Sequence, residues 1–204
     1  MNCFRVMLAG TLLFTGIAVF IIGLNIAEQL YPNYSVSLNC VSDLGATCHG
    51  TICKTIQPSA MIFNSTIFLA GIFVSIAAYL IRIEFNSRAF AISLALSGIG
   101  TMCVGIFPES AGHIHVLAAL VAFAFGGLSA ITAFAFLRPL FSYISVLLGL
   151  MALIALALII LDEDIGLGAG GMERLVIYPI LIWALGFGGY LMHYFQEIPQ
   201  NKND

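Results

Sequence analysis

Six long stretches of the chain carry no charged residue. Between the charged residues that flank them, these stretches hold 22, 27, 20, 28, 23 and 22 residues. A helix needs about 20 mostly apolar residues to cross the hydrocarbon core of a bilayer. Because lipid offers no hydrogen bonds to the backbone, only helices or a closed barrel can span it. Runs such as Ile144–Leu161 are apolar on every face and lack the alternation of barrel strands, so the pattern predicts helices.

The same pattern sets the expected ends of the spans. We predict transmembrane helices over Leu8–Leu24, Ala60–Ile81, Ala89–Phe107, Ile114–Phe136, Phe141–Leu161 and Leu175–His193. The connections between them are short except for the segment Asn25–Ser59. The chain is therefore expected to form a single all-α domain over residues 1–204, a polytopic bundle of six transmembrane helices.

Composition supports a membrane protein and excludes the soluble classes. Hydrophobic residues make up 61% of the 204 residues and charged residues 8%, whereas a soluble domain has about 25% charged residues. The net charge of −3 gives no basic patch, so no nucleic-acid partner is expected. Membrane lipids are the expected partners of a multi-pass protein of the cell membrane. The sequence identifies neither a cofactor nor a protein partner.

The basic residues predict the orientation. Six spans put both termini on one side of the membrane. That side holds Arg5, Arg82, Arg88, Arg138 and Lys202, and the opposite side holds Lys54 and Arg174. Because cytoplasmic loops are enriched in Lys and Arg, five against two predicts cytoplasmic termini. The segment Asn25–Ser59 then lies outside the cell.

Carboxylates and imidazoles gather on the predicted outer side, from segments far apart in sequence. Asp43, Glu109 and His113 are candidate catalytic residues, because such groups exchange protons. The candidate metal ligands are His113, His115, Asp43, Glu109 and Glu173. The alternative is an interhelical hydrogen-bond cluster that holds the spans together.

Spacing refines these expectations. Glu109 and His113 would share a face of one helical turn, whereas His113 and His115 would point about 200° apart on a helix. In an extended segment, the two histidines could instead share a metal ion. Arg174 is expected to pair with Glu109 or Asp43.

Two polar residues are candidate contacts for a lipid headgroup. Arg174 can hold a phosphate with two hydrogen bonds, and Asn64 starts the second span on the outer side. Asn64 is also expected to bond a neighbouring backbone group or the Asp43 loop. The glycine-rich stretch Gly166–Gly171 follows no strand, so we predict a flexible, solvated loop there and not a phosphate site.

Three cysteines share the long outer segment. An oxidising exterior favours one disulfide, with Cys48–Cys53 as the expected pair and Cys40 left as a thiol. The alternative is a zinc site made by these three cysteines and His49, although the usual paired C-x-x-C spacing is missing.

Several short motifs resemble one family. They are Ser42-Asp43-Leu44-Gly45, Asn64, Gly71, Phe107-Pro108-Glu109 with His113, Glu173-Arg174-Leu175 and Trp183. In order and spacing they resemble the DUF998 family of small polytopic membrane proteins, found in archaea and bacteria with some eukaryotic relatives. A more distant similarity to the Frag1/DRAM/Sfk1 group of six-span proteins is a further hypothesis. The resemblance implies the fold and no activity.

Three functions compete at this point. A lipid-binding or scaffold and assembly role needs only packing and a polar cluster at the outer face. The alternative is an intramembrane hydrolase or transferase, with or without a catalytic metal ion, that acts on lipid or lipid-linked substrates at the outer leaflet. Ion-coupled transport is disfavoured, because no Asp, Glu, Lys or Arg lies near the centre of a predicted span.

The orientation is testable by labelling cysteines from outside intact cells with a membrane-impermeant maleimide. After mild reduction, Cys48 should react, whereas Cys3 at the predicted cytoplasmic end should react only once the membrane is permeabilised. The opposite pattern would reverse the predicted orientation.

Overall fold

The computed structural model describes residues 2–50, 52–85 and 87–194. Within this part of the chain, six helices are long and apolar enough to cross a membrane, which confirms the predicted all-α polytopic fold. They are α1 Cys3–Leu30, α2 Ser59–Glu84, α3 Arg88–Ile106, α4 His113–Thr132, α5 Pro139–Ile160 and α6 Gly168–Tyr194.

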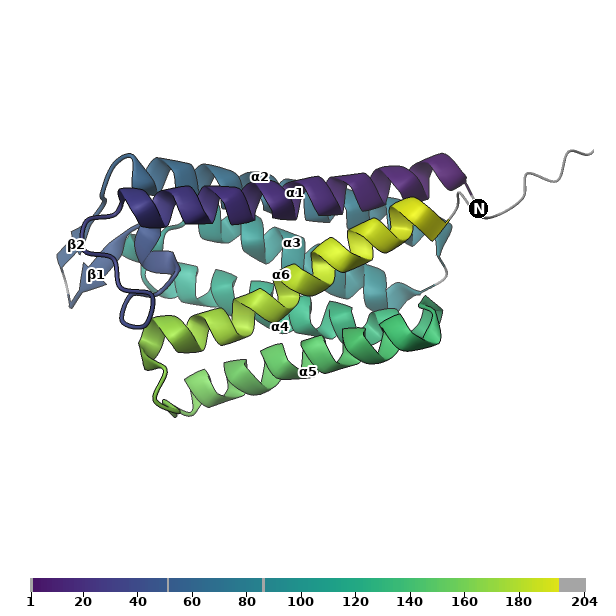
Figure 1. Cartoon of the computed structure of the whole chain (residues 1–204). Coiled ribbons are helices and arrows are strands. Elements are labelled where there is room, and N and C mark those ends of the chain that lie inside the picture. The colour runs from purple at the N-terminus through teal and green to yellow at the C-terminus, as the bar shows by residue number, and fades with distance from the viewer. Residues whose placement is uncertain (1, 51, 86, 195–204) are drawn as a thin grey trace, which may run out of the picture.

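Short elements fill the connections. The α1–α2 segment contains the 3₁₀ turn η1 Ser42–Leu44 and an antiparallel hairpin of β1 Thr47–His49 and β2 Ile52–Lys54. Two further 3₁₀ turns are η2 Glu109–Ala111, before α4, and η3 Ala133–Phe136, after it. The hairpin lies at one end of the bundle, and the N-terminus and the last turn of α6 lie at the other (Figure 1). We call the hairpin end the loop end.

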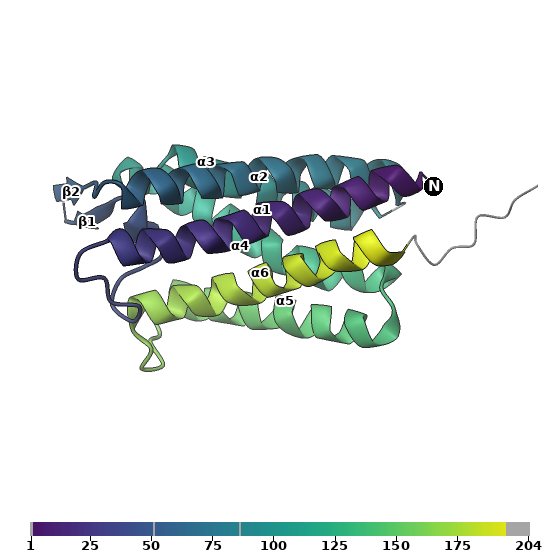
Figure 2. The same cartoon turned by 45° about the horizontal axis from the view of Figure 1, so that its top comes forward.

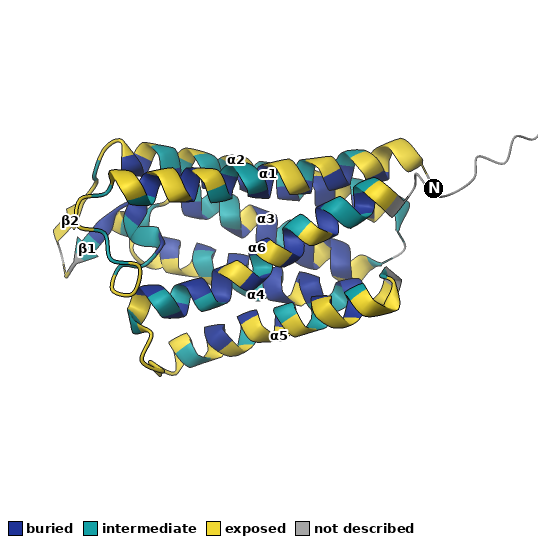
Figure 3. Ribbon diagram, viewed as in Figure 1, coloured by how far each residue is buried: buried dark blue, intermediate teal, exposed yellow. Residues whose placement is uncertain are grey.

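The helices form a closed ring. Each helix packs against the next in sequence, and α6 returns to pack against α1. The turned view shows α6 running beside both α1 and α5 (Figure 2). Buried residues face the inside of the ring and exposed residues cover its outside, including long apolar side chains on every helix (Figure 3). An apolar exterior of this kind matches a lipid environment.

Small residues let neighbouring helices approach closely. A Cβ atom at Gly71 of α2 would lie less than 3.0 Å from backbone atoms of Gly98 and Met102 on α3. Close backbone contact through small residues is a common way to pack helices in lipid, where apolar burial gives little driving force. Farther along the ring, Trp183 and Phe187 of α6 stack with ring centroids 5.3 Å apart, and both lie edge-on to Phe90.

The glycine-rich stretch differs from its prediction. α6 begins at Gly168 instead of Leu175, so Gly168–Gly171 form its first turn and not a flexible loop. The amide of Gly170 donates to the Ser37 carbonyl over 2.9 Å, and a side chain at Gly170 would collide with the carbonyls of Val36 and Asn39. Glycine is therefore needed there because the α1–α2 segment lies directly against this turn.

Candidate functional site

A buried arginine joins three parts of the loop end. Arg174, on α6, is 4% exposed. Its Nη2 donates to Glu28 Oε1 and to the Tyr34 hydroxyl, both over 2.6 Å. Its Nη1 donates to the carbonyls of Val36, Asn39 and Gly170 over 2.9, 3.1 and 3.0 Å. A guanidinium presents its donors in a rigid fork, and here the fork ties α6 to the end of α1 and to the segment that follows it.

The expected partner of Arg174 was wrong. The expected partners were Glu109 and Asp43, whereas the structure pairs Arg174 with Glu28 at the last turn of α1. Tyr34 completes the site, since it accepts from Arg174 and donates to the Cys40 carbonyl over 2.9 Å. Burial raises the pKa of Tyr34, so its hydroxyl keeps the proton that it donates. The sequence signal for Glu28 was its position as the charge that ends the first apolar stretch.

The neighbouring residue, Glu173, holds the other side of the same segment. Its carboxylate accepts the backbone N–H of Val41 over 2.5 Å, and it also contacts the backbone N–H of Ser42 and the thiol of Cys40. Two consecutive residues of α6 therefore fix residues 28–42 from two directions.

Asp43 and Glu109 meet under the hairpin. Their side chains share a hydrogen bond, and Asp43 also accepts from the Asn39 amide over 3.0 Å. Burial, the charge of Asp43, this hydrogen bond and the charge of Glu173 raise the pKa of Glu109 to about 7. Glu109 therefore keeps part of its proton at neutral pH, because burial and nearby negative charge disfavour its ionised form.

Cys40 lies beside these carboxyls. Burial and the charges of Glu173, Asp43 and Glu109 raise the pKa of its thiol to about 12. It therefore remains a thiol that donates to Glu173 and has little thiolate character. Cys48 and Cys53 form a disulfide across the hairpin, where the two residues face each other in register.

His113 and His115 do not lie in one site. Gly112, with a φ of 62°, breaks the chain between η2 and α4, so Glu109 and His113 do not share a helical turn as expected. His113 and His115 both lie on α4 and face different ways, His113 exposed and His115 6% exposed. Asn64 donates to the Gly45 carbonyl over 3.3 Å, which confirms the expected bond to the Asp43 loop.

The candidate metal ligands are not gathered into one site. In the described part of the chain, no three His, Cys, Asp or Glu side chains are placed to hold a metal ion together. Asp43, Glu109 and Glu173 are coupled through their charges, but His115 bonds a backbone carbonyl instead, with Nδ1 2.8 Å from the Phe107 oxygen.

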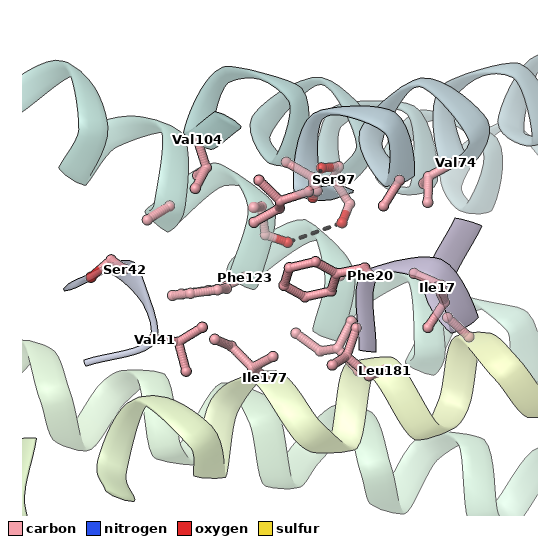
Figure 4. A pocket seen from close by; sticks show the side chains of 18 of the residues that line it. Ile17, Phe20, Val41, Ser42, Val74, Ser97, Val104, Phe123, Ile177 and Leu181 are labelled. Carbon is pink, nitrogen blue, oxygen red and sulfur yellow. Dashed lines mark hydrogen bonds between the residues drawn. The ribbon is translucent and has the colours of Figure 1, made fainter. Parts of the chain in front are cut away.

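Two hollows adjoin this end of the bundle. An interior cavity of about 80 Å³ lies within the ring, lined by apolar side chains of α1, α2, α3, α4 and α6 (Figure 4). Figure 4 labels Phe20 and Phe123 among the side chains that line it, together with Ile177 and Leu181 of α6. A cavity of this size holds at most a few water molecules, each of which occupies about 30 Å³ in the liquid.

The second hollow is a larger groove of about 530 Å³. It lies at the loop end between α4, the end of α5 and the start of α6. Its apolar lining is Val116, Ala119, Leu120, Phe123, Leu156, Ile159, Ile160, Ala169 and Met172. Its polar lining is Cys40, Ser42, His115, Asp162, Glu163, Asp164 and Glu173. The sequence did not reveal this groove, because its α4 and α5 walls carry no Asp, Glu, Lys or Arg.

The groove reaches the outside of the bundle. Val116 and Ile160 are more than 60% exposed although they line it, so its mouth opens between helices that face lipid. His115, Ser42, Ala119, Phe123 and Glu173 line both hollows and form the wall between them.

These features define a polytopic α-helical membrane protein with an amphipathic groove at one end of its bundle. The chain belongs to the DUF998 family, since the family model described as a protein of unknown function matches residues 14–189. Neither the curated proteins nor the solved structures give a match. The similarity to the Frag1/DRAM/Sfk1 group stays a hypothesis.

Arg174→Met should strongly destabilise the protein, because it leaves the Glu28 carboxylate and the carbonyls of Val36 and Asn39 without their donor. Breaking a buried ion pair costs about 3–5 kcal/mol of stability. Arg174→Lys should cost part of that stability, because an ammonium group lacks the forked donors of a guanidinium. Thermal unfolding in detergent measures the effect. Arg5→Met is the control, since Arg5 is exposed and its pair with Glu84 should contribute about 0–1 kcal/mol. Equal losses in both variants would contradict the assigned role.

Glu109 should make stability depend on pH. Between pH 4.5 and 7 the folded protein keeps a proton on Glu109 that the unfolded chain has lost, so the free energy of unfolding should fall as pH rises through this interval. Unfolding temperatures at pH 5 and pH 8 should differ less in Glu109→Gln than in the wild type. Glu163→Gln, at an exposed acid, should keep the wild-type difference; an unchanged difference in Glu109→Gln would exclude this explanation.

Proposed function

We propose that this protein binds a membrane lipid or related amphiphile in the groove between α4, α5 and α6. The observation that carries the proposal is the groove itself, whose volume of about 530 Å³ lies within the usual size of ligand sites, about 300–1,000 Å³. Its mouth opens between helices that face lipid, so a ligand can enter from the bilayer without crossing water.

The groove is polar at one end and apolar at the other, as an amphiphile is. Acidic side chains of the α5–α6 connection line the part nearest the loop end, and Leu120, Phe123 and Leu156 line the part farther into the bundle. A polar head at the membrane surface and an apolar chain toward the centre match this order. With cytoplasmic termini, the groove opens toward the outer leaflet.

The headgroup site belongs in the groove and not at Arg174 or Asn64. Arg174 donates to acceptors of the protein itself and is almost completely buried. Asn64 is committed to the Gly45 carbonyl. A phosphate at Arg174 would have to displace the contacts that hold the α1–α2 segment.

The alternative function, a hydrolase or transferase, has one feature in its favour. Glu109 exchanges its proton near neutral pH, as a general acid or base does. However, the residues that line the groove and the cavity do not include Asp43, Glu109 or His113. Lipid binding is favoured because the proton-exchanging pair and the accessible volume are in different places.

Filling the groove tests the proposal. Leu120 lines it and Leu117, one turn earlier on α4, does not, although both are exposed leucines. Leu120→Trp should reduce the lipid that copurifies with the protein in detergent, measured by extraction and mass spectrometry. Leu117→Trp should retain the wild-type amount. Equal lipid content in the two variants, or no tightly held lipid in the wild type, would contradict the proposal.

A further inference from the structure

The groove contains acidic side chains and neither Lys nor Arg. The acids in its lining are Asp162, Glu163, Asp164 and Glu173. The nearest guanidinium, on Arg174, is turned into its own network with Glu28. An anionic headgroup in this groove would meet carboxylates and no compensating charge, which is strongly unfavourable at low dielectric.

The buried histidine adds a hydrogen-bond acceptor. The Phe107 carbonyl only accepts hydrogen bonds, so the bond of 2.8 Å places the proton of neutral His115 on Nδ1. Its Nε2 then carries a lone pair. In the described part of the chain, no partner is found for this atom, and the residue, although 6% exposed, lines the groove. An acceptor that lines the groove and has no partner among the described residues is available to a ligand that donates to it.

The apolar walls suit a single chain. Along α4 the groove extends from His115 to Phe123, a distance of about 12 Å at 1.5 Å per residue. Leu156, Ile159 and Ile160 of α5 face this stretch from the other side. The volume is that of a site for one small molecule.

We propose that the groove binds a single-chain amphiphile whose head is a protonated amine. The ammonium donates to Glu173 and to His115 Nε2, the three acids of the α5–α6 connection supply the surrounding negative charge, and the chain lies between α4 and α5. This inference rests on the proposed function, since it assigns the ligand class to the same groove.

The test uses the full-length protein in nanodiscs of phosphatidylcholine. A dodecylamine that carries a photoactivatable diazirine is crosslinked, the labelled peptides are mapped by mass spectrometry, and unlabelled dodecylamine, dodecanol and dodecyl phosphate compete. We expect labelling on α4 and α5, and competition by the amine at about tenfold lower concentration than by the alcohol, a difference of about 1.4 kcal/mol. Dodecyl phosphate should not compete.

Variants assign the recognition to particular groups. His115→Asn keeps a donor for the Phe107 carbonyl and removes Nε2, and it should weaken amine competition. Asp162→Asn, Glu163→Gln and Asp164→Asn together remove three charges and should weaken it further. Asp164 Oδ1 caps the amides of Gly166, Leu167 and Gly168, and asparagine keeps that oxygen. Asp162 has a φ of 58°, which asparagine tolerates. If the triple variant does not fold, the single variant Glu163→Gln replaces it. Glu84→Gln, at the opposite end of the bundle, is the control and should leave amine competition unchanged.

The outcomes separate the two proposals. Equal competition by dodecylamine and dodecanol, with labelling in the groove that Leu120→Trp abolishes, would overturn the amine and leave lipid binding intact. Stronger competition by dodecyl phosphate would do the same. Labelling that avoids α4 and α5, or that Leu120→Trp leaves unchanged, would overturn both proposals.

Discussion

The loop end depends on one buried cation. Arg174 lies where the ring of helices meets the long α1–α2 segment, and its Nη1 donates to the carbonyls of Val36 and Asn39 in that segment. Unsatisfied carbonyls there would each cost about 1–3 kcal/mol. Because the guanidinium also pairs with Glu28, the last turn of α1, the start of α6 and the segment between them have one relative position. The site architecture follows from that position.

The contacts of Arg174 also determine which ionisable side chains face the groove. Residues 173 and 174 are adjacent on α6, so their side chains leave the helix in different directions. Arg174 points to Glu28 and Tyr34, whereas Glu173 lines the groove while holding the Val41 amide. The guanidinium is paired inside the protein, and the carboxyl group of Glu173 is left beside the hollow. A site that excludes anions thus results from how the fold is held together.

The sequence predicted the parts of this structure that depend on hydropathy. Charge-free stretches located all six helices, because a charge inside lipid is costly whatever its neighbours are. The start of α6 was missed, since Gly168–Gly171 resemble a loop until the carbonyls of the α1–α2 segment are seen against them. The partner of Arg174 was also missed, because Glu28 lies 146 residues away and only the closure of the ring brings them together. Gly112 separated Glu109 from His113 through a backbone angle that spacing does not reveal.

The groove and the Asp43–Glu109 pair place two separate groups of acidic side chains at the same end of the molecule. Beneath the hairpin, burial and the charge of Asp43 raise the pKa of Glu109, which lets the two acids stay close without two full charges at neutral pH. The acids of the α5–α6 connection are exposed to solvent instead. Glu173 belongs to both groups, coupled to Glu109 by charge and open to the groove. A positive head beside Glu173 would relieve that repulsion, which an anionic or neutral head cannot do.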